Sequence, residues 1–128
     1  MLLVEYQYDL FTKIFLDTDL EKTSVVETVS LMVKGSTAGS RIVTEQAEIF
    51  IFNNGDFDEE RRNRGSDEFL YYKYYLDIEP IEDVEETLYI KEISKILTKL
   101  WDSGYKAVAS CDFEEELPRK GGYNFEER

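Results

Sequence analysis

The segment from Asp83 to Asp102 carries the strongest structural pattern in the chain, and it constrains the fold more than any other stretch. Capping residues Asp83 and Glu86 lie at its start, and Gly104 follows its end. Apolar side chains recur at intervals of three and four residues, at Leu88 or Tyr89, Ile93, Ile96, Leu97 and Leu100. This spacing predicts an amphipathic helix with one buried stripe, so the rest of the chain must supply a surface that covers it.

Four other stretches have the patterns of strands and can supply such a surface. Apolar and polar residues alternate from Leu2 to Leu16, where the length of the run predicts a break near Asp9. Apolar, β-branched and aromatic residues are concentrated in three further runs, at 41–52, 69–76 and 105–113. We therefore predict four strands.

A second, shorter helix is predicted between the first two strands. Ser24 and Glu27 match a capping box, and Gly35 is expected to end the helix in the left-handed conformation. The apolar residues at helical spacing are Val25, Val29, Met32 and Val33. Residues 35–40 are predicted to be a loop, and the charged stretch 55–68 is predicted to connect the second and third strands.

The predicted order of elements is strand, helix, strand, strand, helix, strand. This is the order of a ferredoxin-like βαββαβ sandwich, an α+β fold in which two helices cover one face of a four-stranded antiparallel sheet. The length of 128 residues suits a single domain over 1–128. Residues 117–128 form a C-terminal tail whose order the sequence leaves open. Resemblance to known proteins stops at the order of elements, and that fold hosts many unrelated functions.

The charge of the chain restricts its partners. Asp and Glu number 28 against 15 Lys and Arg, which gives a formal net charge of −13. Such a chain repels polyanions, so we expect no binding to nucleic acid or to anionic membranes and favour a basic protein partner. The single cysteine, the lack of a targeting signal and the lack of a membrane-spanning run predict a cytoplasmic location.

Residue types also argue against an enzyme. The chain has no histidine, which removes the commonest general base and metal ligand. Cys111 lies in a strand pattern and is expected to be a buried structural residue. The acidic run from Asp56 to Glu60 lacks the spacing of a calcium-binding loop. We predict no catalytic residues, no metal site and no cofactor.

The sheet face that the helices leave uncovered is the candidate binding surface. Odd-numbered aromatic residues should point to this face, whereas a solitary monomer would carry polar residues there. A second candidate is an acidic cluster at the end of the last strand. The predicted partner-binding residues are Phe11, Phe15, Phe69, Tyr71, Tyr75, Asp112, Glu114, Glu115 and Glu116. The alternative is that the tail or the 55–68 connection folds back over the aromatic residues.

Three functions are compatible with these patterns. The first is a protein-binding module, such as an inhibitor or immunity-type protein that neutralises a basic enzyme, for example a nuclease toxin. The second is a homodimer that packs two aromatic sheet faces together, with any ligand between them. The third and least favoured is a carboxylate- or metal-dependent enzyme. An RNA recognition motif is rejected because its sequence pattern is missing from 69–76 and the net charge opposes phosphate binding.

Overall fold

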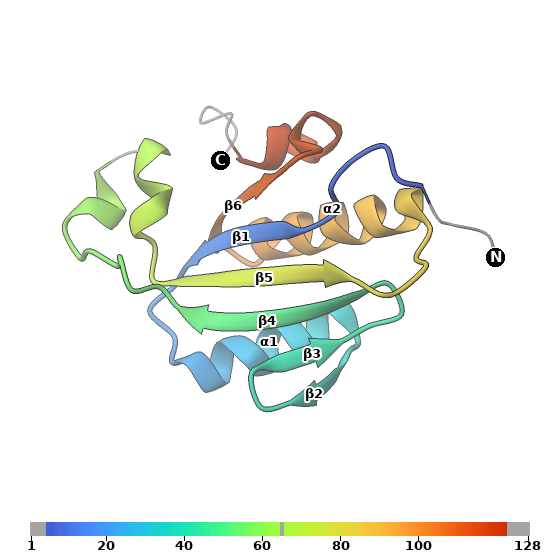
Figure 1. Cartoon of the computed structure of the whole chain (residues 1–128). Helices are drawn as coiled ribbons and strands as arrows, with labels where there is room; N and C mark the ends of the chain where they lie inside the picture. The colour runs from blue at the N-terminus through green and yellow to red at the C-terminus, as the bar shows by residue number, and fades with distance from the viewer. Residues whose placement is uncertain (1–4, 65, 123–128) are drawn as a thin grey trace.

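A computed structural model describes residues 5–64 and 66–122, and it places two helices behind one antiparallel sheet (Figure 1). The strand order is β2-β3-β4-β5-β1-β6. The strands are β1 (Thr12–Asp17), β2 (Ser36–Ala38), β3 (Arg41–Val43), β4 (Ala47–Asn53), β5 (Tyr74–Pro80) and β6 (Lys106–Cys111). The helices are α1 (Lys22–Val33) and α2 (Glu86–Asp102). The α+β class and the antiparallel pairing are confirmed, whereas the prediction of four strands is wrong because the sheet has six.

The two additional strands arise between α1 and β4. Gly39, with a φ of +63°, turns the chain so that Ser36–Ala38 pairs with Arg41–Val43. The strand Ser36–Ala38 thus lies in residues 35–40, which were predicted to be a loop. The predicted strand 41–52 is divided at Thr44, whose hydroxyl accepts hydrogen bonds from the backbone N–H groups of Gln46 and Ala47. A side chain thus takes the place of ladder partners and produces a turn.

The first predicted strand is also shorter than its pattern suggests. β1 begins only at Thr12, and residues 2–4 of the predicted strand lie outside the described residues. The backbone N–H groups of Gln7 and Tyr8 donate to the Glu86 carboxylate at 2.8 and 3.1 Å. Because a side chain satisfies these donors, the segment before β1 runs past the start of α2 without a pairing strand.

The third predicted strand begins five residues too early. Residues 66–71 form two short 3₁₀ turns joined by a kink at Glu68, and β5 starts at Tyr74. The Asn54 side-chain amide donates to the carbonyl oxygens of Leu70 and Tyr72 at 2.9 and 2.7 Å. The prediction that the strand begins at residue 69, made from aromatic composition, is therefore wrong, because these carbonyl oxygens accept hydrogen bonds from a side chain and not from a neighbouring strand.

The core lies between the helices and one face of the sheet. The predicted stripe of α2 is confirmed, because it is buried at Tyr89, Ile93, Ile96, Leu97 and Leu100, whereas Leu88 is exposed. The fully buried positions of β1, β4 and β5 alternate, and they include Ile14, Leu16, Ile49, Ile51, Leu76 and Ile78, whereas β6 also buries Val108, the neighbour of Phe15. The alternating residues of β1, β4 and β5 share one cluster with α1 and α2, so the opposite strand residues must point away from the helices.

The helix starts differ from the predicted capping motifs. Glu21 and Glu85 are the N-cap residues, and neither makes a side-chain capping hydrogen bond. The left-handed residue after α1 is Lys34 and not Gly35. Gly35 is required for another reason, because a Cβ atom there would lie 2.5 Å from Cγ2 of Ile42.

The outer edge of β6 is covered by the segment Pro118–Gly122 (Figure 1). Arg119, Lys120, Gly121 and Gly122 all have positive φ, which coils the segment in the left-handed sense. The indole N–H of Trp101 donates to the carbonyl oxygen of Ala107 at 2.9 Å, and the Arg119 guanidinium stacks on the Trp101 ring. The first six residues of the predicted tail are thus packed, and 123–128 lie outside the described residues. No helix in the described part of the chain is long and apolar enough to cross a membrane.

Candidate functional site: the open sheet face

The sheet face turned away from the helices, here called the open face, carries a row of aromatic side chains. Strand register places Phe52 of β4 beside Tyr75 of β5, and Tyr75 beside Phe15 of β1. The ring centroids of Phe52 and Tyr75 are 5.2 Å apart, and those of Phe15 and Tyr75 are 6.5 Å apart. Phe52 remains 39% exposed, so this row presents aromatic surface to solvent.

A second row on the open face is charged at its centre. Phe50, Asp77 and Lys13 lie side by side across β4, β5 and β1. The Lys13 ammonium lies 4.3 Å from the centroid of the Tyr75 ring and 5.8 Å from that of Phe15. Lys13 therefore turns toward the aromatic row, and among the described residues no ion pair joins it to Asp77.

The Asp77 carboxylate is only partly satisfied in the described part of the chain. Its Oδ1 atom is buried and has no donor among the described residues. Burial raises the pKa of the Asp77 carboxyl, and the positive charge of Lys13 opposes this shift. The carboxylate is thus incompletely satisfied at the centre of the sheet.

The β4–β5 connection, residues 54–64 and 66–73, covers one end of the open face. Phe69 contacts Phe15 edge to face, with ring centroids 5.4 Å apart. A hollow of about 490 Å³ remains between this connection and the sheet, lined by Lys13, Phe15, Asn54, Gly55, Asp56, Leu70, Tyr71 and Tyr75. Phe69, which follows the 55–68 stretch, therefore covers Phe15, whereas Phe52 remains exposed.

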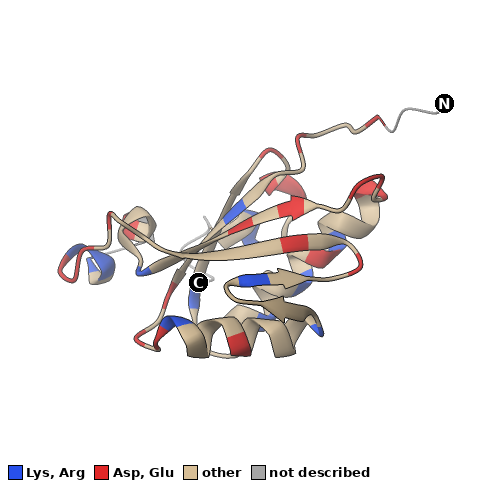
Figure 2. Cartoon of the chain, turned by 60° about the horizontal axis from the view of Figure 1, so that its bottom comes forward, with Lys and Arg blue, Asp and Glu red and all other residues tan. Residues whose placement is uncertain are grey.

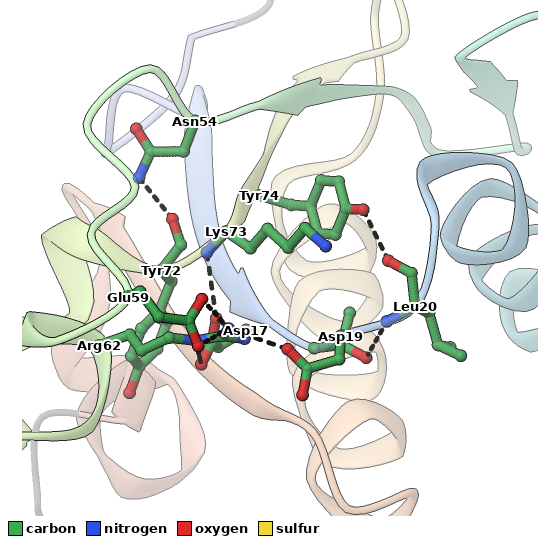
Figure 3. Close-up of polar contacts among 10 residues, drawn as sticks. Asp17, Asp19, Leu20, Asn54, Glu59, Arg62, Tyr72, Lys73 and Tyr74 are labelled. Carbon is green, nitrogen blue, oxygen red and sulfur yellow. Dashed lines mark hydrogen bonds and ion pairs between the residues drawn. The ribbon is translucent and has the colours of Figure 1, made fainter.

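A buried ion pair anchors the connection to the end of β1 (Figure 3). Arg62 and Asp17 are only 5% and 8% exposed, and the Arg62 guanidinium contacts both carboxylate oxygens of Asp17 at 2.9 and 3.0 Å. The backbone N–H of Lys73 donates to the same carboxylate. Asp19 and Glu59 supply further carboxylates at 2.8 and 3.3 Å from the guanidinium. Hydrogen bonding to Asp17 is the main cause that raises the pKa of Arg62, so this group remains a cation.

The predicted acidic cluster is largely engaged within the chain. Asp112 accepts a hydrogen bond from the backbone N–H of Asp9, and Glu114 accepts one from that of Cys111, both at 3.1 Å. A hydrogen bond with Glu116 is the main cause that raises the pKa of Tyr8. Glu115 is exposed. Three of these four carboxylates therefore hold the segment before β1 and the end of β6 in place.

The other aromatic residues predicted for the site, Phe11, Phe69 and Tyr71, lie outside the strands. Phe11 is 41% exposed and borders a separate, open hollow with Lys13 and Asp112. Phe69 and Tyr71 belong to the β4–β5 connection and not to a strand. Tyr71 lies under the Arg61 guanidinium, 3.9 Å from its ring centroid. Leu70, which the predicted strand would bury, is 49% exposed.

Sequence reasoning missed Lys13, Asp77 and Phe52 as members of the site. The period of two places Lys13 on the same side as Phe15, and Asp77 on the same side as Tyr75. This signal is present in the alternation, but a face identified by its aromatic residues alone does not reveal its charged members. The Arg62–Asp17 pair gives no local signal, since the two residues are distant in the sequence.

The open face presents aromatic rings, an ammonium group and carboxylates, which can contact apolar and charged groups. Among the described residues, no three side chains of the Cys, Asp and Glu type gather to hold a metal ion. Burial raises the pKa of the Cys111 thiol to about 11, so this group is protonated at neutral pH. Comparisons with protein-family models, with curated proteins and with solved structures each found no match.

Proposed function

We propose that this chain is a protein-binding module that receives a basic protein on its open face. The observation that carries the proposal is the aromatic row of Phe52, Tyr75 and Phe15, of which Phe52 is partly exposed on the sheet face turned away from α1 and α2. Aromatic anchors of this kind supply much of the energy of protein interfaces. An inhibitor or immunity-type protein that blocks a basic enzyme, such as a nuclease, is the function that these features support best.

The charge distribution supports a basic partner over a second copy of the chain. Asp and Glu exceed Lys and Arg along the strands and loops in Figure 2, and the net charge is −13. Glu48, Asp77 and Glu79 lie on the open face by the alternation of β4 and β5. Glu48 pairs with Arg41, so Asp77 and Glu79 remain for a basic surface to neutralise, whereas two copies that each carry a net charge of −13 would repel one another.

The order of the strands supports a fold for this module, and its single cysteine supports a location. Without the β2–β3 hairpin, the sheet order β4-β5-β1-β6 is that of a split βαβ arrangement, so we propose a ferredoxin-like fold with an inserted hairpin. A single, half-buried cysteine suits a reducing compartment, and we propose that the protein works in the cytoplasm.

A comparison of two charge variants tests the proposed interface. Phe52→Glu places a charge in the aromatic row, and Leu31→Glu is the matched control because Leu31 is 74% exposed on α1. Proteins captured by the immobilised wild-type chain and by each variant are identified by mass spectrometry, and the captured enzyme is assayed with each chain added. We expect a basic enzyme whose capture and inhibition fall at least about tenfold with Phe52→Glu but not with Leu31→Glu.

Two results would contradict the proposal. Equal capture and inhibition by the wild-type chain and the Phe52→Glu variant would show that the open face is not the interface. A mass that doubles with concentration in the wild-type chain alone, and stays that of a monomer in the Phe52→Glu variant, would instead identify the homodimer.

A further inference from the structure

Lys13 occupies a position on the open face that another cation could take. Its ammonium lies over the Tyr75 ring, at 4.3 Å from the centroid, and not against the carboxylate of Asp77, its cross-strand neighbour. A cation above an aromatic ring is attracted by the negative face of the π system. The Tyr75 ring therefore already takes part in a cation–π contact, and its cation is Lys13 of the same chain.

Asp77 provides a second group that such a cation would contact. Tyr75 and Asp77 are two residues apart on β5, so their side chains leave the same face of the sheet. The Asp77 carboxylate forms no ion pair within the described part of the chain, and its Oδ1 atom has no donor there. The Lys13 ammonium contacts the ring and makes no direct ion pair with the carboxylate, although its positive charge still acts on Asp77 from a distance.

We propose that Tyr75 and Asp77 form a seat for an arginine side chain of the partner, and that Lys13 fills this seat in the free chain. This inference rests on the proposed function and adds to it the chemistry of the partner residue. A guanidinium is planar, stacks on aromatic rings and donates several parallel hydrogen bonds to a carboxylate. It can therefore engage the ring and the carboxylate together, which the ammonium of Lys13 does not do.

One consequence is that Lys13 weakens binding by competing for the seat. A partner arginine must displace the Lys13 ammonium from the Tyr75 ring before it stacks there. Removing this ammonium should strengthen binding beyond the general effect of a more negative chain. Lys91 on α2 is exposed, so the loss of its charge reports the general effect alone.

The test uses a small probe, so that it does not depend on identifying the partner. N-acetylarginine amide is titrated into the ¹⁵N-labelled wild-type chain and the Lys13→Met and Lys91→Met variants, and dissociation constants are taken from amide chemical shifts. We expect Lys13→Met to bind about two- to fivefold more tightly than Lys91→Met, with the largest shifts at residues 75–77. N-acetyllysine amide should gain less from Lys13→Met than the arginine probe does.

Two further variants keep the result decisive. Adding Asp77→Asn to Lys13→Met should cancel the gain if the carboxylate is part of the seat. Lys13→Gln replaces Lys13→Met should the latter fail to give a native thermal transition. Equal affinities of Lys13→Met and Lys91→Met, or shifts away from β5, would overturn the inference. In that case, loss of partner capture by Phe52→Glu would still support the proposed function. If instead Lys13→Met binds the arginine probe more tightly but Phe52→Glu captures the partner as well as the wild type does, the proposed function alone is rejected.

Discussion

The guanidinium of Arg62 lies 2.9 Å from the carboxylate of Asp17, although 45 residues separate the two in the chain. Both side chains are buried, and both stand where the β4–β5 connection meets the end of β1. This pair fixes the connection against the sheet and so maintains the hollow beside the aromatic row. The shape of the candidate site thus depends on a contact outside it.

Removing the cation from this pair should destabilise the fold strongly. Arg62→Met leaves the Asp17 carboxylate buried and uncompensated, and we expect a loss of about 3 to 5 kcal/mol in the free energy of unfolding. Urea denaturation measures this quantity. The control is Arg41→Met, because the Arg41–Glu48 pair is far less buried and should contribute less than about 1 kcal/mol. Similar losses for both variants would show that the Arg62–Asp17 pair has no special role.

The buried stripe of α2 gives a second stability prediction. Ile93 is fully buried, and Ile93→Ala should cost about 2 to 5 kcal/mol through lost burial and a residual cavity. Leu88→Ala on the same helix is the control, since Leu88 is 42% exposed and should cost about 1 kcal/mol or less. Denaturant unfolding of the two variants under identical conditions decides between a core and a surface role.

The two faces of β5 and β4 should respond differently to charge. Leu76→Glu puts a carboxylate into the core, where Leu76 is fully buried, and we expect this variant not to fold. Phe52→Glu should retain a cooperative thermal transition and lose only about 1 kcal/mol, mainly from its contact with Tyr75. Thermal melts followed by circular dichroism check both outcomes. Unfolding by Phe52→Glu would mean that the open face is part of the core.

Asp77 should make stability depend on pH in an unusual direction for a carboxylate. Because burial raises its pKa in the folded chain, the folded state holds this proton more tightly than the unfolded state does. Its contribution to stability is full below the ordinary pKa of 3.8 and is lost as the pH rises through the folded pKa. Asp77→Asn removes the ionisation, so its stability relative to the wild type should increase between about pH 3 and pH 7. Denaturant unfolding across that range measures this difference, and a constant difference would contradict the assignment.

The left-handed segment at the end of the described chain predicts a glycine requirement. Gly122 has a φ of +103°, and a Cβ atom there would lie 2.7 Å from the carbonyl oxygen of Ala107. Gly122→Ala should therefore cost about 1 to 3 kcal/mol. Gly55→Ala is the matched control, because its added Cβ would meet open space and its φ is not in the left-handed region. Unfolding experiments that rank the two variants equally would show that the β6 edge does not need this close approach.

The elements that the sequence predicted correctly are those whose local pattern agrees with their environment. The stripe of α2 and the alternation around Ile14 and Leu76 predicted which residues are buried, since these segments pack against the core along their whole length. Prediction failed where side chains replace backbone partners, as Thr44, Asn54 and Glu86 do. Such substitutions depend on residues brought together only by the fold, and no periodicity records them. Phe15 and Tyr75 of the aromatic row could be predicted from alternation, whereas Phe52 was missed and the Arg62–Asp17 pair has no periodic signal.

The two edge strands of the sheet, β2 and β6, differ in whether another strand could pair with them. The segment Pro118–Gly122 blocks β6, whereas β2 has three exposed residues and no strand beyond it in the described part of the chain. A sheet that can be extended at one border only cannot polymerise by adding strands to both. If two copies of this chain pair through their β2 strands, no unpaired edge is left for a third copy. The packed segment beside β6 therefore prevents extension of the sheet into a fibril.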